Sequence, residues 1–298
     1  AYLGVKTIIT TKIEHHAVLH TVTHLDEKGC KIIYLPVDKK GNISAFDLEE
    51  ALSNSASKTL VTLMHINNEI GTILNLEEVA HLCKKHEAYF HTDAVQGVGH
   101  YAIDLSAIPI DFMSASAHKF HGPKGIGFAF VRKNVKLGAF IIGGGQERGH
   151  RAGTEAVHNI VGMEKALTLS YAHLEQEKKK ILDLKKYAIA GFKKIYPGVR
   201  FNGCCSEEHR STYTLLNVNL PVSAEKKLLL DFHLDLKGIA CSKGSACQSG
   251  SNTGSHVLNE ILSTKELGNP SLRFSFSIFN TQEEVDYLLS ELKTFSQS

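Results

Sequence analysis

The stretch that decides the fold is KTIITTKIEHHAVLHTVTHLDEKGCKIIYLPV, which spans residues 6–37. It opens with a β-branched run typical of a strand, continues with a helical pattern closed by Gly29, and ends in a second strand-like run. A strand, a helix and another strand in this order form a unit whose two strands lie parallel. The alternation continues through residues 46–131, which predicts an α/β fold with a mostly parallel sheet.

The sequence changes in character beyond this region. One long helix is predicted from Thr154 to Ile195, and after it two or three strands occur among helices. We therefore predict two domains, a large domain over residues 1–172 and a smaller C-terminal α+β domain over residues 173–298. Because Ala1 leads almost directly into a strand, we expect the N-terminal part of the large domain to be missing from this sequence.

Composition and charge exclude several classes of protein. Apolar residues make up 43% of the 298 residues and charged residues 21%, which is the balance of a soluble globular protein. The 33 basic and 31 acidic side chains leave a net charge of +2, so we expect neither a nucleic-acid partner nor a membrane surface. No apolar run approaches the roughly 18 residues of a membrane span. The start of the chain also lacks the pattern of a signal peptide.

The spacing of cysteines and histidines indicates neither disulfides nor a metal site. None of the six cysteines forms a C-x-x-C pair, and His15–His16 has no second ligand cluster beside it. We expect a cytoplasmic protein with reduced thiols. Buried, inert thiols are expected at Cys30 and Cys83, and exposed loop thiols at the adjacent pair Cys204–Cys205.

Polar side chains follow several of the predicted strands, at the positions where α/β enzymes keep their sites. Asn67–Asn68–Glu69 follows the strand LVTLMHI. Its side-chain amides would orient a ligand oxygen, or the segment is simply a turn. Asp93 ends the strand AYFHTD, and Gln96 lies about one helical turn further on. Asp93 suits a helix N-cap, or a carboxylate that stays ionised beside a cationic ring nitrogen.

A lysine occupies the next such position, in Ser116–Ala117–His118–Lys119, which follows IDFMSA and precedes GPKGIG. A lysine at a strand end is usually only exposed, but beside a histidine and among glycines it would also suit Schiff-base formation. Asp93 and Lys119 are one strand–connection–strand unit apart, so both would face the same crevice.

Two glycine-rich segments carry further reactive side chains. Residues 143–154 have the sequence GGGQERGHRAGT. Its two arginines, together with Thr154 as the cap of the following helix, would bind an anion. The alternative is that the segment is only a glycine-rich linker. In SKGSACQSGSNTGS, residues 242–255, ten of the fourteen residues are Ser, Gly, Asn or Thr, which predicts a mobile loop. Cys247 near its centre would then be an exposed nucleophile or an incidental thiol.

Taken together, these segments resemble the cysteine desulfurases of the NifS/IscS type, which are fold-type I pyridoxal-phosphate enzymes of the class V aminotransferase group. GSAC inside a long Ser/Gly loop matches the group I branch of that family. The matching stretches occur in the family's order over almost the whole chain: IEHHAVL, MHINNEIGTI, HTDAVQGVG, SASAHKFHGPKGIG, GGGQERGHRAGT, GSACQSGS and SLRFSFS.

The resemblance implies a pyridoxal phosphate site and a homodimer. Lys119 would bind the cofactor aldehyde as a Schiff base, Asp93 would pair with the ring nitrogen, and His15 would stack on the ring and assist proton transfer. Thr154 would reach the phosphate bound in the neighbouring subunit. The side chains expected to bond the ring oxygen, the substrate side or the phosphate are Asn68, Gln96, Ser116 and His118.

The implied reaction converts L-cysteine to L-alanine. Arg273 would bind the substrate carboxylate with its fork of donors. Cys247 would attack the sulfur of the substrate and keep it as a persulfide. The acceptor of that sulfur would be an iron–sulfur scaffold protein, a sulfur carrier or a tRNA-thiolation protein.

Several features depart from the family pattern. Its Gly-Ala-Thr-Glu phosphate-binding segment would precede Ala1, SGSNTGSHV replaces a Leu-Glu-Pro stretch, and Ile278 stands where an arginine is common. The C-terminal tail is also short. Two alternatives therefore stay open beside the desulfurase, namely a selenocysteine lyase on the same fold and a non-catalytic homologue that binds little cofactor.

Overall fold

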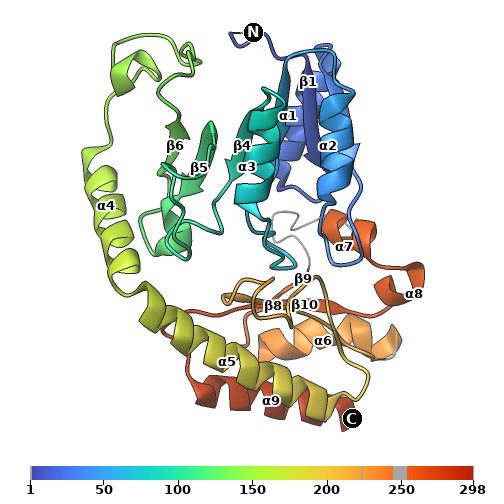
Figure 1. Cartoon of the computed structure of the whole chain (residues 1–298). Helices are drawn as coiled ribbons and strands as arrows, with labels where there is room; N and C mark the ends of the chain where they lie inside the picture. The colour runs from blue at the N-terminus through green and yellow to red at the C-terminus, as the bar shows by residue number, and fades with distance from the viewer. Residues whose placement is uncertain (1, 223, 244–253, 298) are drawn as a thin grey trace. The chain divides into compact units, whose positions relative to one another are not determined.

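The computed structural model describes residues 2–222, 224–243 and 254–297 (Figure 1). The chain forms two compact units, each with its own sheet. Unit 1 consists of Ala1–Pro36, Ser44–His65 and Leu74–Leu174. Unit 2 consists of Glu175–Ser298 together with two early segments, Val37–Ile43 and Ile66–Ile73, which the sequence does not single out.

The sheet of unit 1 confirms the predicted α/β fold. Its six strands follow the order β2-β1-β3-β4-β5-β6. The pairs among the first five strands of that order are parallel, and β6 joins β5 antiparallel. The strands are β1 (Thr7–Thr11), β2 (Lys31–Leu35), β3 (Thr59–Thr62), β4 (Tyr89–Asp93), β5 (Phe112–Ser116) and β6 (Gly127–Val131).

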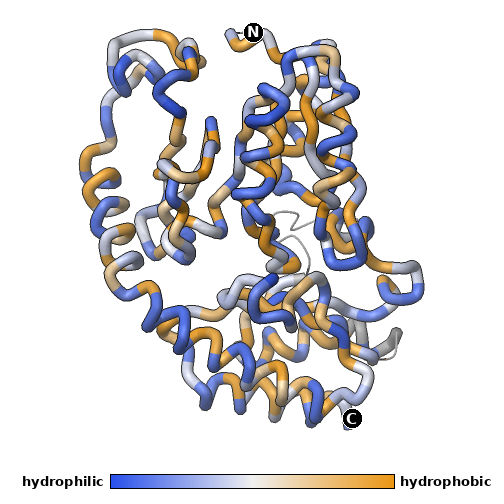
Figure 2. Tube along the Cα trace, viewed as in Figure 1, coloured by the Kyte–Doolittle hydropathy of each residue, from blue (hydrophilic) through white to orange (hydrophobic). Residues whose placement is uncertain are grey.

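Three helices with N-terminal caps connect the parallel strands, namely α1 (His16–Glu27), α2 (Ala45–Ser53) and α3 (Leu76–Lys85). Ser44 and Asn75 cap α2 and α3, since each side chain accepts a hydrogen bond from a backbone N–H in the first turn. All five residues of β1 are buried, as expected of a parallel strand covered on both faces. Figure 2 shows the hydrophobic and hydrophilic residues alternating along the helices.

The predicted long helix is two helices, α4 (Val157–Ala172) and α5 (Leu174–Ile195), separated at His173. Glu175 and Glu177 lie in the first turn of α5, where negative charge favours a new helix start. The prediction that Thr154 caps this region is wrong. Ala156 is the N-cap residue of α4, because the helix begins three residues after Thr154.

Unit 2 is the predicted α+β arrangement. Its four strands follow the order β7-β8-β10-β9 in an antiparallel sheet. Helix α5 packs on this sheet, where the ring centroids of Phe192 and Phe274 lie 5.6 Å apart. Among the described residues, no helix is both long and apolar enough to cross a lipid bilayer. The remaining elements are β7 (Arg200–Phe201), β8 (Leu215–Asn219), β9 (Ser242–Lys243), β10 (Ser271–Ser275), α6 (Ala224–Leu236), α7 (His256–Ile261), α8 (Thr264–Leu267) and α9 (Gln282–Gln297).

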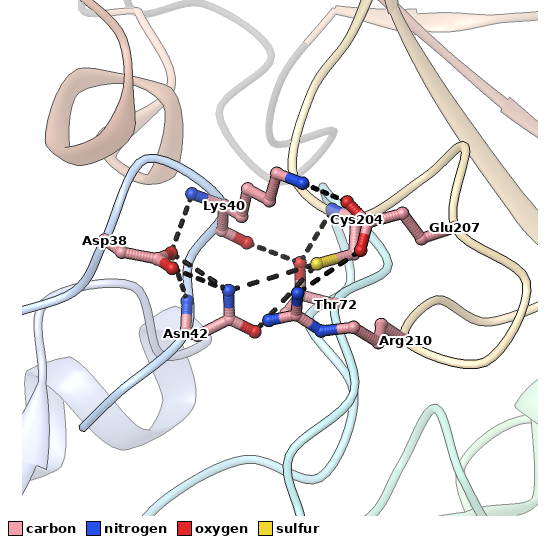
Figure 3. Close-up of polar contacts among 7 residues, drawn as sticks. All are labelled: Asp38, Lys40, Asn42, Thr72, Cys204, Glu207 and Arg210. Carbon is pink, nitrogen blue, oxygen red and sulfur yellow. Dashed lines mark hydrogen bonds and ion pairs between the residues drawn. The ribbon is translucent and has the colours of Figure 1, made fainter.

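A polar network binds the two early segments of unit 2 to the rest of that unit (Figure 3). The Thr72 hydroxyl donates a hydrogen bond to the carbonyl of Lys40 at 2.7 Å and accepts one from the backbone N–H of Cys204 at 3.2 Å. The Lys40 ammonium forms an ion pair with Glu207, and Arg210 pairs with the same carboxylate at 3.3 Å. Side-chain and backbone bonds thus tie both segments to the chain around residue 204.

Cys204 and Cys205 are buried in this region, so the prediction of exposed loop thiols is wrong. The Cys205 thiol donates to the carbonyl of Ile70 at 3.0 Å and accepts from the backbone N–H of Asn217 at 3.3 Å. The early segments cover both thiols, which the local sequence around them does not reveal. Cys83 is buried as predicted, whereas Cys30 is half-buried.

Candidate functional site

Asp93 and the lysine segment lie at one edge of the sheet in unit 1. Strands β4 and β5 are parallel neighbours, and Asp93 pairs in register with Ser114. The segment Ser116–Lys119 begins only two residues further along β5, so the carboxyl ends of both strands bring these residues to the same edge. Asp93 is 9% exposed, and its Oδ1 accepts a hydrogen bond from the backbone N–H of Val95 at 3.0 Å.

The turn after Asp93 packs directly on the helix that carries Lys119. This is the 3₁₀ helix Ala117–Phe120. His100 Nε2 lies 3.0 Å from the carbonyl oxygen of Lys119. Gly99, at φ +82°, approaches so closely that a Cβ built there would lie 2.4 Å from the Cβ of Phe120. Gln96 is half-buried in the same turn, so the turn and the helix form one packed piece.

The segment that contains Lys119 exposes several side-chain hydrogen-bond donors. The side chains of His118 and Lys119 are exposed, and Ser116 is half-buried at the N-cap position of the helix. Desolvation, and then the positive charges of Lys119 and Lys124, hold the pKa of His118 below its usual value. The lysine ammonium groups, an imidazole N–H and the Ser116 hydroxyl are all donors that suit a phosphate group.

His15 follows β1, a third strand of the same sheet. It is the N-cap residue of α1, and its Nδ1 accepts a hydrogen bond from the backbone N–H of Ala17 at 3.2 Å. The structure therefore gives this half-buried side chain a helix-capping role that the sequence did not predict.

Glu14 is a site residue that sequence reasoning missed. Its carboxyl is buried beside His15, and Oε1 accepts hydrogen bonds from the Thr11 hydroxyl at 3.1 Å and the backbone N–H of Met64 at 3.0 Å. Burial raises the pKa of Glu14 to about 8 against the effect of these bonds, and the charge of Asp93 acts in the same direction. Its polar sequence neighbours, Lys12, His15 and His16, give no signal that this glutamate is buried.

The donor set of unit 1 fits pyridoxal phosphate. The cofactor needs an amine for its aldehyde, a carboxylate for its ring nitrogen and donors for its phosphate. Lys119 supplies the amine and Asp93 the carboxylate, while Ser116 and His118 supply polar groups for the phosphate. Asp93 and Ser116 are the last residues of β4 and β5, and His118 and Lys119 follow β5 directly, so all four come from the same edge of the sheet.

Asn68 and Arg273 come together in unit 2. Arg273, on β10, donates from Nη1 to the main-chain carbonyl of Asn68 at 2.9 Å. Asn217 lies directly opposite Arg273 on β8, and its Nδ2 donates to the carbonyl of Glu69 at 2.8 Å. Two side chains of the sheet therefore hold two consecutive carbonyls of the loop that contains Asn68.

The remaining predicted residues fall outside these clusters. Thr154 is exposed in the connection before α4. In the adjoining segment, Arg151 pairs with Glu147 at 3.4 Å and with Glu155 at 3.5 Å, so its charge is already partly compensated. Cys247 lies outside the described residues.

The sequence is similar to known proteins along almost its whole length. Residues 4–288 match the family model "Aminotransferase class-V". The cysteine desulfurase IscS of Clostridium botulinum is 45% identical over 285 residues, which are 96% of this chain and 70% of that protein. The corresponding IscS of Dictyoglomus turgidum is 41% identical over 97% of this chain and 71% of its own length.

Solved structures share the fold. A structure titled "NIFS-LIKE PROTEIN" superposes with a TM-score of 0.85 at 35% identity, over 97% of this chain and 74% of its own. Another, titled "SspA in complex with cysteine", gives a TM-score of 0.76 at 33% identity, over 93% and 75% of the two chains. The chain therefore belongs to the class V aminotransferase family, among the pyridoxal-phosphate-dependent cysteine desulfurases of the IscS and NifS type.

Proposed function

We propose that this chain is a pyridoxal-phosphate-dependent cysteine desulfurase that converts L-cysteine to L-alanine and stores the sulfur as a persulfide on Cys247. The observation that carries the proposal is the placement of Asp93 and Lys119 at one sheet edge, in a chain of this family. The related SspA structure, whose title names bound cysteine, supports the choice of substrate. In this proposal residues 1–172 bind the cofactor, and residues 173–298 supply the nucleophile.

Pyridoxal phosphate, when bound, withdraws electrons from the bonds around the substrate's Cα. Lys119 would hold the cofactor and move the proton at Cα, and Asp93 would pair with the ring nitrogen. His15 would lie against the ring, while Ser116, His118 and Gln96 would bond its polar groups. Thr154 would contribute to the phosphate site of a second subunit.

The substrate would be held by unit 2 side chains. Arg273 donates one N–H to the Asn68 carbonyl, and its planar guanidinium would present a fork of donors to the substrate carboxylate. The C–S bond of cysteine breaks, its sulfur bonds to the sulfur of Cys247, and Cβ gains a proton. A thiol and cysteine thus become a persulfide and alanine, with no external oxidant.

We also propose a homodimer, a sulfur acceptor and a cytoplasmic location. Large apolar side chains are exposed both in the connection before α4, where Phe140 is 97% and Ile142 is 86% exposed, and on α4 itself, at Val157 and Val161. Burying them against a second copy would remove a large apolar surface from water.

The acceptor would be an iron–sulfur scaffold or another sulfur-carrying protein. The five described cysteines are all free, which suits a reducing compartment.

The test is the absorption spectrum and product analysis of the purified protein. We expect a visible band from the lysine-bound cofactor, and alanine and sulfide from cysteine in the presence of a thiol reductant. Cys247→Ser should keep the band and lose sulfide release. Undiminished sulfide release from this variant would contradict the assigned nucleophile. A strong preference for selenocysteine would indicate a lyase, and failure to bind the cofactor would indicate a non-catalytic homologue.

A further inference from the structure

Glu14 is a buried carboxyl of unit 1 to which the proposed reaction gives no role. Its side chain is 1% exposed, and the residue follows the end of β1 by three positions. Oε1 accepts a hydrogen bond from the hydroxyl of Thr11, the last residue of β1, and a second from the backbone N–H of Met64, which lies two residues beyond β3. One carboxyl oxygen therefore joins the turn between β1 and α1 to the continuation of β3.

The position of Met64 in the sheet explains why this bond needs a side chain. Successive amides of a strand inside a parallel sheet donate alternately to the strands on either side. The residues before and after Met64 both donate to carbonyls of β4, so the N–H of Met64 points towards β1. Strand β1 has already ended at Thr11, and the carboxyl of Glu14 takes the place of the missing backbone carbonyl.

The same bond brings Glu14 near Asp93. The parallel pairing of β3 with β4, continued by two residues, sets Met64 beside Asp93. His65 follows this register, because its N–H donates to the Asp93 carbonyl at 2.9 Å. Two carboxyls, one from the turn after β1 and one from the end of β4, thus lie at the same edge of the sheet on either side of the β3 continuation.

Burial and Asp93 both favour the neutral form of Glu14. Desolvation raises the pKa of Glu14 to about 8 against its two hydrogen bonds, and the charge of Asp93 adds to the rise. Burial holds the pKa values of His65 and His91 below their usual range, so both are neutral near pH 7. The other ionisable side chains flanking Glu14 are those of Lys12, which is exposed, and of His15 and His16, which are half-buried.

We propose that Glu14 is a positioning residue of the cofactor site, which anchors the turn before His15 at Met64 without adding a second negative charge next to Asp93. The inference rests on the function proposed above, in which His15 lies against the ring and Asp93 pairs with its nitrogen. One carboxylate serves that pairing. A second would raise the proton affinity of the nitrogens nearby, including the Lys119 nitrogen that has to move a proton at Cα.

The pH titration of the cofactor band in the holoenzyme tests the charge. In Glu14→Gln the amide keeps an acceptor for Met64 but does not ionise. In the parent, Glu14 becomes charged as the pH passes 8, and this charge retains the proton on the Lys119 nitrogen. The visible band of the lysine-bound cofactor should therefore titrate over a broader pH range in the parent than in Glu14→Gln, with a midpoint about half a pH unit higher. Superimposable titrations of the two proteins would overturn the proposal.

Asp111→Asn is the matched control. Asp111 is half-buried in the same unit, accepts a hydrogen bond from the backbone N–H of Phe90 at 2.9 Å, and has its pKa raised by burial. It precedes β5, so it lies at the opposite end of that strand from Lys119. Its replacement should leave the titration of the band as in the parent. A shift as large as that of Glu14→Gln would show that the effect is not specific to Glu14, and would overturn its assignment.

Amide hydrogen exchange in the cofactor-free protein tests the anchor separately. Glu14→Leu removes the acceptor and keeps most of the side-chain volume, so exchange at the Met64 amide should accelerate about tenfold. Glu14→Gln should keep the parent's rate, because it restores the acceptor. An unchanged rate at Met64 in Glu14→Leu would overturn the anchoring role.

The two measurements also separate this inference from the function on which it rests. A parent protein that binds no pyridoxal phosphate, while exchange at Met64 responds as expected, would contradict the proposed function and with it the role of Glu14 at the ring. A normal cofactor band in the parent together with unchanged exchange in Glu14→Leu would contradict the role of Glu14 alone.

Discussion

Arg273 and Asn217 occupy directly opposite positions on β10 and β8, and their side chains bond two consecutive carbonyls, those of Asn68 and Glu69. The loop that contains Asn68 is thereby fastened to the sheet of unit 2 at two adjacent points. Asn68 and Arg273, the two side chains proposed to meet the substrate, consequently keep a fixed relation to each other.

Asn217→Ala tests this fastening. Asn217 is fully buried, so truncation removes the side-chain donor from the Glu69 carbonyl and one of the two acceptors of Asn202 Nδ2, which keeps its bond to Ser271. We expect a loss of about 1–3 kcal/mol in the free energy of unfolding, measured by urea denaturation, and a raised KM for cysteine. Asn219→Ala is the control, because Asn219 bonds Glu266 and Ser271 but not the loop. A parental KM in Asn217→Ala would count against the fastening.

Lys119→Ala should abolish the visible band of the lysine-bound cofactor. The amine is the group that joins the cofactor aldehyde, so its loss removes the covalent link while the phosphate contacts remain. Absorption spectra of protein reconstituted with pyridoxal phosphate provide the measurement. Lys133→Ala, at an exposed lysine beyond β6, should keep the band. Retention of the band in Lys119→Ala would assign the link to another lysine.

Glu14 should make the cofactor-free protein less stable as the pH rises. Its pKa is about 8 in the folded chain and 4.5 as the ordinary value, so between these values the folded state binds more protons than the unfolded state. The contribution of Glu14 is fully present below 4.5 and is lost as the pH rises towards 8, with a slope of at most about 1.4 kcal/mol per pH unit. Urea denaturation at a series of pH values measures it.

Glu14→Gln should flatten this dependence, because the amide keeps an acceptor for Thr11 and Met64 but does not titrate. The variant should match the parent at low pH and exceed it in stability near pH 8. The same slope in both proteins would show that the titration belongs to another group.

The sequence predicted the strands and the positions at their ends, because β-branched runs and helix caps are local signals. It did not predict that Ile66–Ile73 belongs to unit 2, since the deciding contacts join Asn68 to Arg273 and Glu69 to Asn217, which are 205 and 148 residues apart. The burial of Cys204 and Cys205 was missed for the same reason. Local patterns carry no information about which distant segment covers a residue.

Gly99→Ala tests whether the Asp93 turn and the Lys119 helix act as one piece. The new methyl group would meet the Cβ of Phe120 at 2.4 Å, and Gly99 also sits at φ +82°, so both crowding and backbone strain oppose the change. Together these effects should cost about 2–5 kcal/mol of stability and displace the helix that carries Lys119.

The matched control is Gly29→Ala, at φ +87° with nothing within 4 Å of the added atom. This change carries the backbone strain alone, about 1–2 kcal/mol, at a position after α1. Weaker retention of pyridoxal phosphate on dialysis is therefore expected in Gly99→Ala and not in Gly29→Ala, after both are compared at temperatures where they remain folded. Equal retention in the two variants would mean that the turn and the lysine helix respond independently, and that the contact between Gly99 and Phe120 serves stability only.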